Sequence, residues 1–264
     1  MQCRSRQEMK TLAIEASPKR DGNSITITKS LLKGLRDGGE TEINEFFLND
    51  MNIKPCQGCW KCTEAHEPSC VIDDDMKKIY PELAAADLVV LATPIYWWHI
   101  ASQMKTFLDR MEGFLNGNGP NNLSGKGLIL VVTHLFEDPD GVELAIRMFR
   151  SIAGWAGMSL SVIRYSSVNG HVSDSKEKLE EAYRIGRSYV GWKAPELTVK
   201  CMVSNCKGRF SSIDSLARHL AAAAGPNHRV WRSEHSFPDK GMADDELWTQ
   251  IGRMIRDENM VPSS

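Results

Sequence analysis

Short apolar runs alternate with longer amphipathic segments over most of this chain. Two of the runs, residues 88–92 and 127–132, are uniformly apolar, which is typical of strands covered on both faces of a parallel sheet. Segments between the runs, such as residues 25–37, place apolar side chains at helical spacing. The expected strands are residues 11–16, 42–48, 88–92, 127–132 and 160–163. This alternation predicts the α/β class, with a doubly wound sheet of five parallel strands.

The pattern changes near Pro195. A segment rich in cysteine and histidine follows to about His235, and a short amphipathic helix is expected at about residues 244–255. We therefore place a domain boundary near residue 196. The prediction is an α/β domain at residues 10–195 and a smaller extension at residues 196–264.

Composition excludes several classes of protein. The chain has 264 residues, 42% of them hydrophobic, which is enough for a sizeable core. Its formal net charge of -2 gives no overall attraction to nucleic acid or to anionic membranes. No apolar stretch approaches the roughly 20 residues of a membrane span, and no secretory apolar core follows the first residues. We expect a cytoplasmic protein without a membrane partner.

The loop after the first expected strand has the groups that a phosphate needs. In an open parallel sheet, the ligand lies beyond the carboxyl ends of the strands, where this loop brings backbone amides to a helix N-terminus. Hydroxyl, amide and cationic groups here suit a phosphate monoester such as that of FMN. The candidates are Ser17, Lys19 or Arg20, Gly22, Asn23 and Ser24. The alternative is that Ser and Asn cap the helix for purely structural reasons.

The loop after the third expected strand is strongly aromatic and contains Tyr96, Trp97 and Trp98. Aromatic faces suit a flat ring system, or they cover a hydrophobic subunit interface, and the two roles can coexist. Residues 133–136 follow the fourth strand and are expected to close a third side. His99 and His134 are candidate donors of protons or hydrogen bonds near a bound ring, the alternative being ordinary loop or packing roles.

Seven cysteines in a reducing compartment favour metal or redox chemistry over disulfides. Four of them have the spacing C-x2-C-x2-C-x7-C, namely Cys56, Cys59, Cys62 and Cys70. A tight loop of this kind brings three thiolates to a common centre and lets a fourth return. The spacing predicts a [4Fe-4S] cluster in a loop at residues 55–72. The alternative is a reduced or zinc-binding thiol loop.

A second group of metal-binding residues lies in the C-terminal extension. The pattern Cys201-x4-Cys206 followed by Phe210, Leu216 and His219 is that of a C2H2 zinc finger. The fourth expected ligand is His228, which requires residues 225–226 to break the helix, and His235 is a more remote substitute. The alternative is a plain helical extension.

This zinc-finger pattern raises the question of nucleic-acid binding, because the extension is locally basic. One finger reads about three base pairs, which is too few for useful specificity. A nucleic-acid partner is therefore not expected. A contact with protein or a cover over the active site is preferred.

In their order along the chain, these motifs resemble those of the NAD(P)H-dependent FMN reductase branch of the flavodoxin-like superfamily. The likeness is greatest to archaeal and anaerobic iron-sulfur flavoproteins and covers about residues 10–192. The motifs that carry it are Ser17-Pro18-Lys19, Gly22-Asn23-Ser24, Pro55-Cys56 with Cys59 and Cys62, Cys70 to Met76, Ala86-Asp87, Pro94-Ile95-Tyr96, and Gln103-Met104-Lys105 with Asp109-Arg110. The resemblance implies a flavodoxin-like fold. It also implies FMN bound by Ser17, Lys19, Asn23, Ser24, Pro94, Ile95, Tyr96 and Trp97. Lys105, Asp109 and Arg110 are expected to form a charge network on a helix surface.

The leading functional hypothesis is an FMN-dependent oxidoreductase with a [4Fe-4S] cluster and a zinc-bearing extension. It would transfer electrons between a reduced donor, either a ferredoxin-like protein or NAD(P)H, and a small-molecule acceptor. One alternative is a cluster-free NAD(P)H:quinone or FMN reductase. Another is a redox-sensing nucleic-acid-binding protein that uses the zinc module. A homo-oligomer, dimer or tetramer, is expected.

Overall fold

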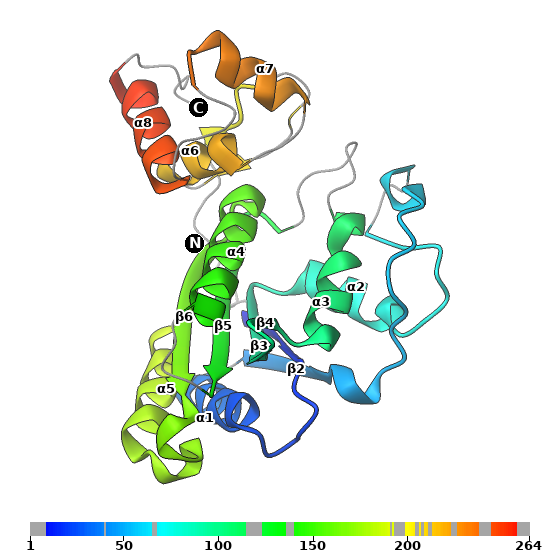
Figure 1. Ribbon diagram of the computed structural model, residues 1–264, viewed down its shortest axis with the longest axis vertical. Coiled ribbons are helices and arrows are strands. Elements are labelled where there is room, and N and C mark those ends of the chain that lie inside the picture. The colour runs from blue at the N-terminus through cyan, green and yellow to red at the C-terminus, as the bar shows by residue number, and fades with distance from the viewer. Residues whose placement is uncertain are drawn as a thin grey trace, which may run out of the picture.

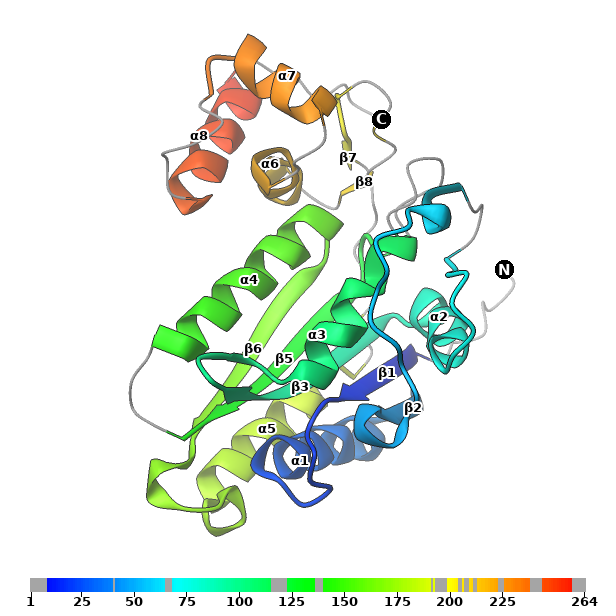
Figure 2. The same cartoon turned by 45° about the vertical axis from the view of Figure 1, so that its right-hand side comes forward.

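The computed structural model describes most of the chain. The described residues are 9–39, 41–64, 68–114, 123–135, 140–190, 192, 199–203, 206, 209–210, 213–222, 226–237 and 244–257. Figures 1 and 2 show an α/β domain with a small group of helices beside the C-terminal end of α4. Among the described residues, no helix is long and apolar enough to cross a membrane.

Five parallel strands form the sheet of the larger domain. They are β1 (Met9–Glu15), β2 (Thr41–Phe47), β3 (Leu88–Tyr96), β5 (Gly127–His134) and β6 (Ser159–Ser166). Their order is β2-β1-β3-β5-β6, which is the doubly wound flavodoxin-like order. The short strand β4 (His99–Ile100) pairs antiparallel with the end of β3. The predicted fold class and the five parallel strands are confirmed.

Helices cover both faces of this sheet (Figure 2). One face carries α1 (Asn23–Gly38) and α5 (Lys176–Ser188), and the other carries α2 (Met76–Ala85), α3 (Ser102–Asp109) and α4 (Asp140–Ala156). Every residue of β5 is buried between the two layers, which explains its uninterrupted apolar sequence. Short 3-10 turns lie in the connections, at Leu48–Asp50, Lys61–Glu64, Met111–Phe114, Ser167–Asn169 and Val172–Asp174.

The C-terminal segment has a separate apolar core. It begins with an antiparallel pair, β7 (Val199–Lys200) and β8 (Arg209–Phe210). Three helices follow, α6 (Ile213–Ala222), α7 (Pro226–Glu234) and α8 (Asp244–Asp257). Buried side chains on these helices form the core, which contains Leu216, Leu220, Trp231, Leu247 and Ile251. We call residues 199–257 the C-terminal module. The predicted boundary near residue 196 lies outside the described residues.

Candidate functional site

A cleft of about 900 Å³ lies beyond the carboxyl ends of β1, β3 and β5. It occupies the place where an open parallel sheet binds its ligand. The structure brings all eight predicted cofactor-binding residues to its walls, namely Ser17, Lys19, Asn23, Ser24, Pro94, Ile95, Tyr96 and Trp97. Residues 17–24, which follow β1, are called the phosphate loop below.

The phosphate loop leads into a helix without a side-chain cap. The Ser17 hydroxyl accepts a hydrogen bond from the Lys19 amide at 3.2 Å, and the Lys19 carbonyl accepts one from the Gly22 amide at 3.2 Å. No side chain caps the N-terminus of α1. The first amides of a helix have no partner within it and carry its partial positive charge. The loop therefore presents the features of an anion site to the cleft.

The loop after β6 is tied to the phosphate loop by two hydrogen bonds. The Asn23 side-chain oxygen accepts from the Val172 amide at 2.8 Å, and His171 Nε2 donates to the Asp21 carbonyl at 2.8 Å. Ser167 and His171 thereby join the lining of the cleft. No sequence motif indicated this wall. The signal that could have found it is the rule that every carboxyl end of a parallel strand faces the same edge.

The aromatic loop is a tight hairpin turn between β3 and β4. Tyr96 pairs with His99, which leaves Trp97 and Trp98 as the two turn residues, with φ of 48° and 59°. Both lie in the left-handed region that such turns require and that usually takes Asn-Gly. Each strained residue costs on the order of 1–3 kcal/mol, and strain of this kind is concentrated at functional sites. Trp97 is 90% exposed at the rim of the cleft.

The first turn of α4 packs directly against this aromatic turn. A Cβ placed on Gly141 would lie 2.8 Å from Cα of Trp98, closer than real contacts allow. Glycine at this position lets the helix approach the turn. Gly141 and Val142 both line the cleft, so α4 begins at the site.

The two candidate histidines are separated. His134, at the end of β5, is buried and lines the cleft with Thr133 and Leu135. His99 is exposed on β4 and is not among the residues that line the cleft. Phe136, also expected there, lies outside the described residues.

Glu15 is a buried carboxyl that no sequence motif indicated. It ends β1 immediately before the phosphate loop and is 6% exposed. Its Oε1 has no hydrogen-bond partner among the described residues. Burial raises the pKa of Glu15 to about 7, and the nearby Glu45 adds to the rise, while Lys29 and Arg20 oppose it. A single acidic residue at the end of an apolar strand was the available signal.

The cysteine loop is exposed at its tip. Cys56 and Cys59 are exposed, Cys62 and Cys70 are partly buried, and none of the four forms a disulfide. Burial raises the pKa of the Cys62 thiol, and the charges of Glu112, Cys70 and Cys56 contribute to the rise. Within the described part of the chain, these four thiols do not form a group that could hold a single metal ion. A cluster of several irons spreads its ligands more widely.

The base of the cysteine loop is fixed by a buried ion pair. Arg110 donates to the two carboxylate oxygens of Asp74 at 2.5 and 3.1 Å, and both side chains are at most 1% exposed. Arg110 also donates to the Lys54 carbonyl at 2.8 Å, and the Lys54 amide donates to Asp74 at 2.9 Å. Burial opposes ionisation, but these hydrogen bonds hold the pKa of Asp74 below its usual value. The two ends of the loop are therefore joined.

This arrangement corrects one prediction. Lys105 and Asp109 form an exposed ion pair on α3, as expected. Arg110 does not belong to that surface network. Because α3 ends at Asp109, Arg110 turns inward to Asp74 instead of continuing the exposed face.

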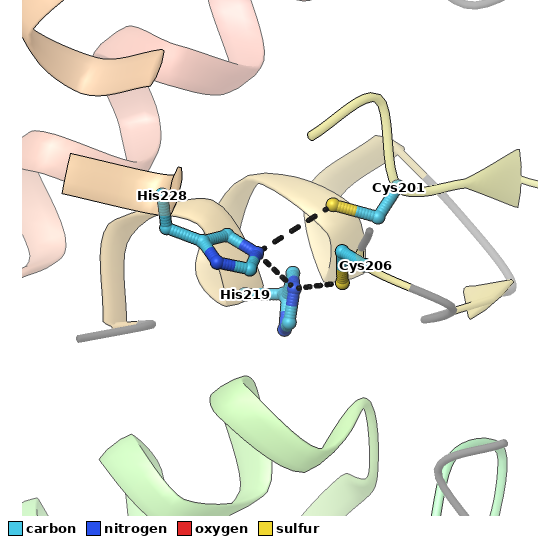
Figure 3. A group of neighbouring side chains, drawn as sticks. All are labelled: Cys201, Cys206, His219 and His228. Atoms are coloured by element: carbon cyan, nitrogen blue, oxygen red, sulfur yellow. Dashed lines mark hydrogen bonds between the residues drawn. The ribbon is translucent and has the colours of Figure 1, made fainter. Parts of the chain in front are cut away.

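Four side chains of the C-terminal module point toward one another (Figure 3). They are Cys201, Cys206, His219 and His228, and their ligand atoms all lie within 4.8 Å of one another. His219 comes from α6 and His228 from α7, and α6 ends at Ala222 before α7 begins at Pro226. His235 lies outside this group and stacks on Trp231, with the two ring centroids 4.3 Å apart. Of the two candidate fourth ligands, the structure brings His228 to the other three.

Comparison with known proteins gives consistent results. The sequence model of the family described as NADPH-dependent FMN reductase matches residues 9–170. An iron-sulfur flavoprotein of Archaeoglobus fulgidus is 32% identical over 172 residues, which are 64% of this chain and 74% of that protein.

Two solved structures share the fold at low sequence identity. An NAD(P)H:quinone oxidoreductase from Methanothermobacter marburgensis has a TM-score of 0.54 at 18% identity, over 69% of this chain and 96% of that one. An FMN-dependent NADH-azoreductase from Bacillus anthracis has a TM-score of 0.52 at 17% identity, over 69% of this chain and 98% of that one.

Proposed function

Because this chain belongs to the NADPH-dependent FMN reductase family and is a flavin-dependent oxidoreductase, we propose that it moves electrons from a reduced donor to a small acceptor through a [4Fe-4S] cluster and FMN. The observation that carries the proposal is the cleft itself. An uncapped helix N-terminus and an exposed aromatic turn line the same 900 Å³ space. Those are the two features that a flavin monophosphate needs.

The residues of the cleft fit FMN. The amides that begin α1, the hydroxyls of Ser17 and Ser24, and the Lys19 ammonium would hold the phosphate. Pro94, Ile95, Tyr96 and Trp97 would contact the ring, and His134 would hold a hydrogen bond or proton beside it. FMN supplies the exchange of one or two electrons when bound, whereas the protein positions it and controls access.

FMN titration of the apoprotein tests this site. Lys19→Ala should weaken affinity by about 10- to 100-fold, the order expected for a hydrogen bond to a charged group. Arg20→Ala is the matched control, because Arg20 pairs with Asp50 and stacks over Phe47 and is not among the cleft residues. Equal effects of the two changes would contradict the site.

For the cysteine loop we propose a [4Fe-4S] cluster held by Cys56, Cys59, Cys62 and Cys70. The iron-sulfur flavoprotein relative and the joined base of the loop support it. The donor would then be a ferredoxin-like protein or NAD(P)H. Cys59→Ser should lose iron and visible thiolate-to-iron absorption while it keeps FMN. Wild-type protein with FMN and no iron, after purification without oxygen, would favour the cluster-free NAD(P)H:quinone or FMN reductase.

We also propose that a second copy of this chain covers the aromatic turn. Large apolar side chains are exposed at the cleft, namely Tyr96, Trp97, Trp98 and Leu135. Exposed apolar residues gathered at a ligand cleft are typical of an interaction site. Wild type should be a dimer or tetramer by analytical ultracentrifugation, and Trp97→Asp should dissociate it. A monomeric wild type would contradict this proposal.

For the C-terminal module we propose a zinc ion at Cys201, Cys206, His219 and His228. The alternative of a nucleic-acid reader gains no support, because α6 packs against α4 and α8 (Figures 1 and 2). A zinc finger inserts this helix into the major groove. Arg232 is buried and donates to the Leu220 carbonyl at 2.7 Å, so it adds no exposed charge.

A further inference from the structure

The four side chains in Figure 3 converge on one point between β7, α6 and α7. His219 Nε2 lies 3.0 Å from His228 Nε2 and 3.4 Å from Cys206 Sγ, and Cys201 Sγ lies 3.7 Å from His228 Nε2. Zinc bonds of about 2.0–2.3 Å at tetrahedral angles place such ligands roughly 3.3–3.8 Å apart. The three separations scatter around this range and all four atoms lie within 4.8 Å of one another, so together they enclose a position for one zinc ion.

This site leaves no position for a substrate or water. Four protein ligands complete the tetrahedron, and catalytic zinc sites keep one position open. His219 is 5% exposed, and the other three ligands are partly buried. The chemistry of the ligand set is therefore that of a structural site.

The second ring nitrogen of His219 reaches outside the module. Nδ1 lies 2.8 Å from the carbonyl oxygen of Trp155, near the C-terminal end of α4. A carbonyl oxygen can only accept a hydrogen bond, so Nδ1 carries the hydrogen. Nε2 therefore keeps its lone pair for the metal. The last four carbonyls of a helix have no partner within it, and metal-bound histidines commonly donate to such a group.

The region beneath this contact is loosely filled. An apolar cavity of about 130 Å³ lies under Trp155, lined by residues that include Phe107, Leu123, Ile152 and Met158. Helix α6 packs on α4 beside it. Support from the module is thus placed beside this cavity.

We propose that the zinc ion fastens the C-terminal module to the α/β domain, with the His219 imidazole as the link between the metal and the end of α4. This inference rests on the zinc ion proposed above. Zinc binding orients His219, and His219 in turn satisfies the Trp155 carbonyl. Loss of the metal should loosen the end of α4 as well as the module.

Hydrogen exchange of the full-length protein tests the link. Removal of zinc by a chelator should speed amide exchange about tenfold or more at residues 150–156, the order expected for a lost hydrogen bond. Exchange in α6 and α8 should rise too, while α1 and β1 should not change. His235→Ala is the matched control, because His235 lies in the same module outside the group of four, and it should keep one zinc and normal exchange at residues 150–156.

His219→Cys separates the metal from the link. A thiolate can replace the imidazole as a zinc ligand but cannot donate to Trp155. Zinc should stay at one per chain, with α6 and α8 protected and exchange at residues 150–156 faster. If this variant loses zinc, NMR of the wild type replaces it. The Nδ1 proton signal of His219 should be present with zinc and lost on chelation, which shows that the link depends on the metal.

Two results would overturn the inference in different ways. Wild-type protein that is purified without bound zinc would contradict the proposed metal site. Zinc that binds stoichiometrically, while its removal leaves exchange at residues 150–156 unchanged, would keep the metal and refute the link.

Discussion

Two regions of this chain carry thiols at metal-binding spacing, and they are organised differently. In the C-terminal module, the proposed ligands come from separate elements packed on an apolar core, and their atoms lie within 4.8 Å of one another. In the cysteine loop, Cys56 and Cys59 are exposed, and the buried ion pair between Arg110 and Asp74 lies at the base of the loop. The comparison teaches that thiols at similar spacing along the chain can lie on a packed core or in an exposed loop, so spacing alone does not fix how the proposed ligands are arranged.

The largest difference should follow from removing one ligand in each region. Cys206→Ser should abolish zinc binding and unfold the C-terminal module, because zinc contributes about 10–16 kcal/mol to isolated zinc-finger folds. Cys59→Ser should lose iron but change the stability of the α/β domain by less than about 0.5 kcal/mol. Metal content and far-UV circular dichroism measure both. Unfolding of the α/β domain by Cys59→Ser would contradict the proposed difference between the two regions.

The base of the cysteine loop should depend on its buried ion pair. Arg110→Met leaves Asp74 buried and uncompensated, and should cost about 3–5 kcal/mol of unfolding free energy. Lys105→Met, which removes the exposed pair with Asp109 on the adjacent helix, should cost less than about 1 kcal/mol. Urea unfolding measures both. Replacing Asp74 by Leu in the Arg110→Met background should recover part of the loss, and no recovery would count against this explanation.

The buried Glu15 should make stability depend on pH. Its folded pKa of about 7 lies above the ordinary value of 4.5, so folding favours the protonated carboxyl. Its contribution to stability is complete below about pH 4.5 and is lost as pH rises through 7. Glu15→Gln should therefore be more stable than wild type at pH 8 by about 2 kcal/mol. Glu42→Gln, an exposed change on β2, is the control, and an unchanged pH profile in Glu15→Gln would contradict the assignment.

The smallest effects should come from two strained tryptophans. Trp97 in the aromatic turn and Trp60 in the cysteine loop have φ of 48° and 59°. Replacing either by Gly should relieve about 1 kcal/mol of backbone strain. FMN titration should distinguish them, because only Trp97 lines the cleft. A loss of FMN affinity in Trp60→Gly equal to that in Trp97→Gly would argue against the aromatic turn as the ring site.

Much of the fold was predictable because the buried strands left a direct signal. The apolar runs at residues 88–92 and 127–132 lie in β3 and β5, and their parallel order follows from alternation with helices. The phosphate loop was also predictable, since it must follow the first strand. These features depend on local sequence and on general rules of topology.

The features that could not be predicted from the sequence depend on contacts between residues that are distant along the chain. The pairing of Arg110 with Asp74 requires α3 to end where it does, and the link between His219 and Trp155 requires the module to dock on α4. The position of the wall formed by Ser167 and His171 follows from the topology rule, but its attachment to the phosphate loop depends on the long-range hydrogen bonds of Asn23 and His171. Spacing along the chain carries little information about such contacts.

Metal and flavin analysis of the full chain, purified without oxygen, tests the central claim most directly. The account predicts one FMN, about four irons and one zinc per chain. Iron should be lost alone in Cys59→Ser, and zinc alone in Cys206→Ser. FMN without iron would contradict the cluster, and a protein that binds no flavin would contradict the assignment of the cleft.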